Sequence, residues 1–66
     1  MKGFLNKAAW IKIKADNGFL YFTAKKVISV SDTHITFIDK FGEMQMFLIS
    51  DIVQIKELRR GDSGGN

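Results

Sequence analysis

The sequence predicts an all-β domain, a small barrel or sandwich of five strands preceded by a short helix. Three observations support this prediction. Apolar and polar residues alternate over several short segments, which is the pattern of half-buried strands. Turn-forming residues separate these segments at close intervals, as in small all-β folds. None of the 66 residues is proline, so proline confines no strand to a sheet edge.

The first nine residues favour one or two turns of amphipathic helix. Phe4 and Leu5 precede Ala8 and Ala9 by four positions, which places the two pairs on one side of a helix. A helix this short is unstable alone. We therefore expect it to dock on the strands that follow.

Two strands joined by a hairpin turn come next. Residues 10–15 alternate between an apolar face and a face that carries Lys12 and Lys14. The pair Asn17-Gly18 then predicts a tight hairpin, because both residues tolerate positive φ. Residues 19–30 form a long second strand whose alternation is interrupted at Lys25-Lys26. This interruption predicts a bend or bulge at the two lysines.

The second half of the chain predicts three further strands. Residues 31–33 form a tight polar connection to a strand at 34–39, and Gly42 supplies positive φ in the turn at 39–43. Ile35 and Phe37 are expected to face inward. A turn at Ser50-Asp51 separates the strand at 44–49 from the last strand at 52–58. The residues from 59 to 66 are expected to be a flexible polar tail, so the domain spans residues 1–58.

The strand at 44–49 is apolar at almost every position and therefore on both faces. A strand of this kind is covered on both sides. A chain this small buries only about 60% of its unfolded surface, so we expect the second cover to come from another subunit. The expected interface consists of Met44, Met46, Phe47, Ile49, Val53 and Ile55.

Composition narrows the classes of function. The chain has no cysteine and one histidine, so no disulfide, metal site or other cofactor is expected. No nucleophile–base pair or glycine-rich phosphate loop is visible, so an enzyme is not expected. Neither a signal peptide nor a membrane span is recognisable, and a cytoplasmic protein is the default expectation. The net charge of +3 and a pI near 9.5 are compatible with an anionic partner such as RNA.

Several segments resemble the Sm-like family, which includes bacterial Hfq, over about residues 4–58. Phe4-Leu5-Asn6 and Gln45-Met46-Phe47 resemble Hfq segments, and the hairpin at Asn17-Gly18 has its counterpart there. The stretch at 31–36 resembles the first Sm motif, and the stretch at 52–55 resembles the end of the second. The resemblance implies an SH3-like or Sm-like, strongly bent barrel. It also implies a homo-oligomeric ring, a hexamer or heptamer, in which the fourth and fifth strands of neighbours pair.

The resemblance further implies an RNA chaperone or regulator that binds single-stranded, uridine- or adenine-rich RNA around a pore. In that arrangement His34 stacks on a base and Thr36 contacts the base edge. Lys12, Lys14, Lys25 and Lys26 are the expected phosphate contacts. The family places a cationic residue after the fourth strand, where this chain has Leu48, Ile49 and Ser50. The alternative is therefore a structural or adaptor oligomer that binds a protein partner and has a degenerate RNA site.

Overall fold

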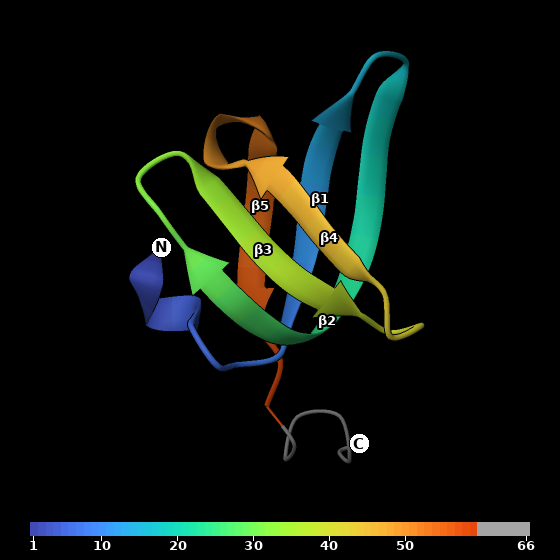
Figure 1. Ribbon diagram of the computed structural model, residues 1–66. Coiled ribbons are helices and arrows are strands. Elements are labelled where there is room, and N and C mark those ends of the chain that lie inside the picture. The colour runs from blue at the N-terminus through green and yellow to red at the C-terminus, as the bar shows by residue number, and fades with distance from the viewer. Residues whose placement is uncertain (60–66) are drawn as a thin grey trace.

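The structure is a computed structural model that describes residues 1–59, and these fold into one sheet of five antiparallel strands (Figure 1). The prediction of an all-β fold is confirmed. The predicted tail at 59–66 lies outside the described residues except for Arg59. In chain order the elements are η1 (Lys2–Phe4), β1 (Ala9–Ala15), β2 (Gly18–Val30), β3 (His34–Asp39), β4 (Met44–Leu48), η2 (Ile49–Asp51) and β5 (Ile52–Glu57).

The sheet has the order β4-β3-β2-β1-β5, so β4 and β5 are its two edges. Only the short 3-10 turn η2 connects these edge strands. A sheet whose two edges are joined by so short a connection must be strongly bent. Within residues 1–59, however, no pairing joins β4 to β5, so the sheet is open and a closed barrel is not confirmed.

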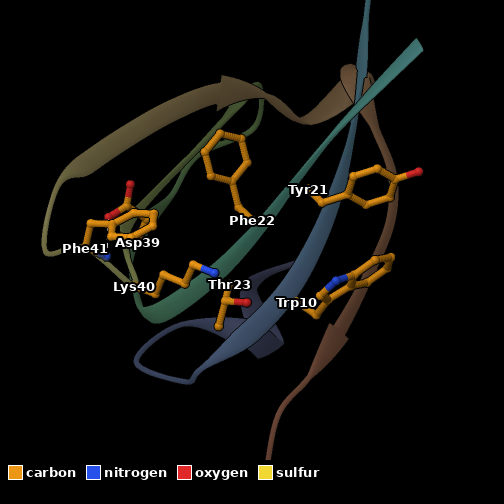
Figure 2. A pocket seen from close by; sticks show the side chains of 7 residues that line it. All are labelled: Trp10, Tyr21, Phe22, Thr23, Asp39, Lys40 and Phe41. Carbon is orange, nitrogen blue, oxygen red and sulfur yellow. Dashed lines mark hydrogen bonds between the residues drawn. The ribbon is translucent and has the colours of Figure 1, made fainter.

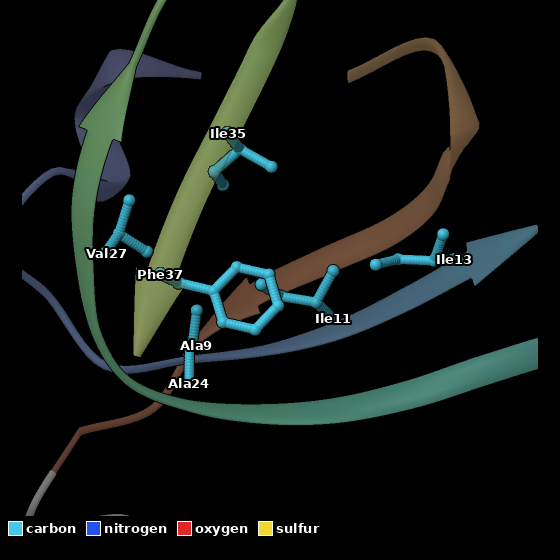
Figure 3. Packing of buried hydrophobic residues seen from close by; sticks show 7 residues of the cluster. All are labelled: Ala9, Ile11, Ile13, Ala24, Val27, Ile35 and Phe37. Carbon is cyan, nitrogen blue, oxygen red and sulfur yellow. The ribbon is translucent and has the colours of Figure 1, made fainter. Parts of the chain in front are cut away.

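The concave side of the bent sheet contains the hydrophobic core (Figure 3). The ring of Phe37 lies at its centre and is fully buried. Phe22 and Phe47 pack near it, with ring centroids 5.5 and 6.1 Å from that of Phe37. The inward orientation predicted for Ile35 and Phe37 is confirmed. The buried apolar residues are Ala9, Ile11, Ile13, Ala24, Val27, Ile35 and Phe37.

β2 bends where it changes its partner strand. It pairs with β1 from Gly18 to Ala24 and with β3 from Ala24 to Val30. The register with β3 shifts between Ala24 and Lys26 and again between Val27 and Ser29. The predicted irregularity at the two lysines is therefore confirmed.

The N-terminal segment differs from the predicted helix of one or two turns. It forms a single 3-10 turn that ends at Phe4. Asn6 has a φ of 65°, the left-handed conformation that stops a right-handed helix. The backbone then bonds to the bend of β2: Asn6 N–H donates to the Val27 carbonyl at 2.8 Å, and Val27 N–H donates to Lys7 O at 2.9 Å. Residues 6 and 7 thus bond to the backbone of β2 instead of continuing the helix.

The predicted turns are present, with one difference in register. Ala15 pairs with Gly18, so Asp16 and Asn17 form the loop of the first hairpin. Of the Asn-Gly pair only Gly18 has positive φ, at 145°. The prediction for Gly42 is confirmed, with a φ of 84°.

Candidate nucleic-acid interface

His34 and Thr36, the two residues expected to contact a base, differ in accessibility. His34 is half-buried at the start of β3, and its Nδ1 lies 2.7 Å from Thr33 Oγ1. Its backbone N–H donates to Ser31 Oγ at 3.0 Å, which fixes this corner. Thr36 is only 9% exposed and pairs with Ser29 of β2 and Met46 of β4. Little of Thr36 is therefore accessible to a base edge in this structure, and its contact with RNA stays a prediction.

The lysines predicted to bind phosphate do not surround His34. Lys26 pairs with Ile38, which lies four residues along β3 from His34, a distance of about 13 Å at strand rise. Lys12 and Lys14 lie on β1, which β2 separates from β3. The structure therefore does not bring the six predicted residues together.

The surroundings of His34 offer little attraction for phosphate. Its strand partner is Leu48. A neighbouring pocket is lined by apolar, hydroxyl and acidic side chains and by no lysine or arginine among the described residues. The lining residues are Asp32, Thr33, Leu48, Ile49 and Ser50.

A different surface combines lysines with aromatic rings. It is the outer side of β5, β1 and β2, opposite the core, and we call it the aromatic–lysine face. Strand pairing places Lys12 between Tyr21 and Gln54, and Trp10 between Thr23 and Lys56. Three lysines and no acidic residue are among its eight members. These members are Trp10, Lys12, Lys14, Phe19, Tyr21, Thr23, Gln54 and Lys56.

Lysine ammonium groups on this face lie near aromatic rings. Lys12 Nζ is 4.3 Å from the centroid of Phe19 and 5.9 Å from that of Tyr21. Lys56 Nζ is 5.8 Å from the ring of Trp10. Exposed contacts of this type contribute about 0.5–1 kcal/mol. They orient the lysines but are weak enough to leave them available to a phosphate.

The sequence pattern predicted only Lys12 and Lys14 of this face as RNA contacts. The hairpin register was the available signal. A two-residue loop at Asp16 and Asn17 places Lys12 beside Tyr21 and Lys14 beside Phe19. The contribution of Lys56 could not be found in this way, because β5 joins β1 from the far end of the chain.

The residues expected at an interface between subunits divide into two groups. Phe47, Ile49 and Ile55 pack against the core of their own chain. Met44, Met46 and Val53 are exposed on the two edge strands, Met46 at 62%. The first group is half-buried, and the second group is the more accessible to another molecule.

The turn between β3 and β4 is organised by Asp39. Its Oδ1 accepts hydrogen bonds from the backbone N–H groups of Phe41 and Glu43, both at 2.9 Å. Gln45 Nε2 donates to Oδ2 at 3.1 Å. The bond from Glu43 is the largest cause that lowers the pKa of this carboxyl; the bonds from Gln45 and Phe41 and the charge of Lys25 also lower it, while burial opposes them.

We expect Asp39→Asn to destabilise the protein at pH 7. The asparagine amide places N–H donors toward Gln45 and lacks the charge. Folding lowers the Asp39 pKa below its unfolded value of about 3.9. The ionised carboxylate therefore stabilises the folded state above that pH, and this stabilisation is lost as the pH falls through the folded pKa. Urea unfolding at pH 7 and pH 3 measures the effect. If the free energy of unfolding differs between wild type and variant by the same amount at pH 7 and at pH 3, this role of the Asp39 charge is contradicted.

The residues the structure describes contain no helix with the length and apolar character of a membrane span. Comparison with protein-family models, with curated proteins and with solved structures finds no match for this chain.

Proposed function

We propose that this chain binds single-stranded RNA, uridine- or adenine-rich, and acts as an RNA chaperone or regulator. The observation that carries this proposal is the aromatic–lysine face. Exposed rings such as Tyr21, which is 59% exposed, offer stacking surfaces for unpaired bases. The lysines beside them offer charge to the phosphates. Stacking with few directional contacts is tolerant of base sequence.

The finer part of the proposal is an Sm-like ring. The strand order leaves β4 and β5 as open edges at opposite sides of the sheet. Unpaired edges are templates for pairing with another chain. Pairing of β4 with β5 of a neighbour is heterologous and forms a ring when the rotation closes. The exposed methionines of β4 support contact with a second copy at this edge.

We expect oligo-U or oligo-A to bind at low ionic strength and to dissociate as salt is added. A strand that contacts Lys12, Lys14 and Lys56 gives a slope of about −2 in log K against log salt, since each phosphate contact on a single strand contributes about −0.7. Fluorescence anisotropy of a labelled oligonucleotide measures it. Lys14→Gln should reduce the slope by about 0.7, whereas the control Lys2→Gln should leave it unchanged. Absence of any salt-dependent binding by the wild type would refute RNA binding.

The second candidate is an adaptor oligomer that binds a protein. The burial of Thr36 and the absence of a basic side chain from the described pocket beside Leu48 favour it. Native mass spectrometry of protein purified without nuclease separates the two candidates. Co-purified RNA supports RNA binding, and one protein partner without nucleic acid supports the adaptor.

A further inference from the structure

A pocket of about 320 Å³ opens beside the aromatic–lysine face, where two strands separate (Figure 2). Ala24 and Asp39 are the last pair between β2 and β3 at this end. Continued pairing would bring Thr23 and Phe22 opposite Lys40 and Phe41. These four residues instead line the pocket, together with Trp10, Tyr21 and Asp39.

The hydrogen bonds of Asp39 explain why the strands separate. Its carboxylate draws the backbone of Phe41 and Glu43 into the turn, and Gly42 N–H donates to the Asp39 carbonyl at 3.0 Å. The chain therefore leaves the sheet directly after Asp39. Residues 19–23 of β2 keep a strand neighbour on the β1 side alone within the described chain. Such an edge has backbone N–H and C=O groups that are free to bind a ligand.

The walls of the pocket are aromatic, and one of the aromatic residues, Phe22, is held in place by the core. Figure 2 shows Trp10 and Tyr21 on one side, Phe41 on the other, and Phe22 between them. Phe22 also packs on the core, with its ring centroid 5.3 Å from that of Phe47. Phe41 is 78% exposed, although it is a large apolar side chain. Lys40 Nζ lies 5.3 Å from the Phe41 ring and adds a positive charge.

We propose that this pocket binds one unpaired nucleobase of a single strand, with the adjoining phosphates at Lys40 and Lys56. The inference rests on the proposed RNA binding and names its base-binding subsite. The pocket volume lies at the lower end of the range for ligand sites, about 300–1,000 Å³, which suits a single base. The flat face of a base can stack on the aromatic rings, and its polar edges can form hydrogen bonds with the unpaired backbone groups of β2. Aromatic walls also suit a neutral sugar. The positive charge of the lysines favours a polyanion such as RNA over such a sugar.

The test uses the fluorescence of Trp10, the single tryptophan of the chain. Titration with oligo-A or oligo-U is expected to change its emission, and an abasic oligonucleotide of equal charge is expected to bind more weakly. Loss of one base–aromatic stack, worth about 1–3 kcal/mol, corresponds to roughly a five- to 150-fold weaker affinity. Phe41→Ala is expected to produce a loss in this range. Lys40→Gln should weaken binding and lower its salt dependence.

Two variants outside the pocket serve as controls. Ile28→Ala removes an exposed apolar side chain, and Lys2→Gln removes an exposed charge; both should bind as the wild type does. If oligonucleotides bind but neither Phe41→Ala nor the abasic substitution changes affinity, the pocket assignment is wrong while RNA binding stands. If no oligonucleotide binds, both proposals fail. A salt-independent response of Trp10 to a neutral oligosaccharide, with none to RNA, would also overturn the nucleobase assignment.

Discussion

Phe37→Ala is expected to remove most of the folding free energy of the chain at 25 °C. The Phe37 side chain is fully buried at the centre of the core and lies within 6.1 Å, centroid to centroid, of two other phenylalanine rings. Removal of a buried phenylalanine ring costs about 3–5 kcal/mol. Small domains have total stabilities near the low end of about 5–15 kcal/mol, so this one change removes most of the folding free energy.

Urea unfolding at one fixed protein concentration measures the effect, since assembly would otherwise change the apparent stability. Phe41→Ala is the matched control, because it deletes the same ring from an exposed turn and should change stability by no more than about 0.5 kcal/mol. Phe37→Leu should lose less than Phe37→Ala, because it leaves a smaller cavity. Equal urea midpoints for Phe37→Ala and Phe41→Ala would contradict the central role of Phe37.

Met46→Lys is expected to convert the proposed hexamer or heptamer into single chains. Met46 is exposed in the isolated chain, so a lysine there costs little folding free energy. The same lysine on an edge strand opposes pairing with another chain. Light scattering at micromolar concentration measures the mass, and circular dichroism measures the retained fold.

Ser29→Lys is the control for this variant. It adds the same charge at an exposed position of β2, away from both edge strands, and should leave the mass unchanged. A wild-type protein that is monomeric at micromolar concentration would contradict the ring. An assembled Met46→Lys variant would show instead that the outer face of β4 takes no part in the interface.

Local patterns were sufficient for the strands and most of the turns. Alternation predicted β3 with the bounds that the structure has, His34–Asp39, and the doubled lysine marked the bend of β2. The N-terminal helix was the exception. Its spacing suited a helix, yet the backbone of residues 6 and 7 bonds to Val27, a partner about twenty residues away that a local pattern cannot reveal.

The candidate site depended much more on tertiary contacts. The resemblance directed attention to His34 and Thr36, but Thr36 is only 9% exposed in the folded chain. Lys12 and Lys14 were found as one face of a strand. Their relation to Trp10, Tyr21 and Lys56 follows from pairing between three strands.

The sequence by itself determined the class of fold, the segments that form strands and the inward orientation of Ile35 and Phe37, because side-chain alternation and turn chemistry act over a few residues. The tertiary structure alone decided which strands are edges, where β2 exchanges β1 for β3, and that a pocket opens beyond Ala24 and Asp39. The physical reason is that register and strand separation depend on contacts between distant segments.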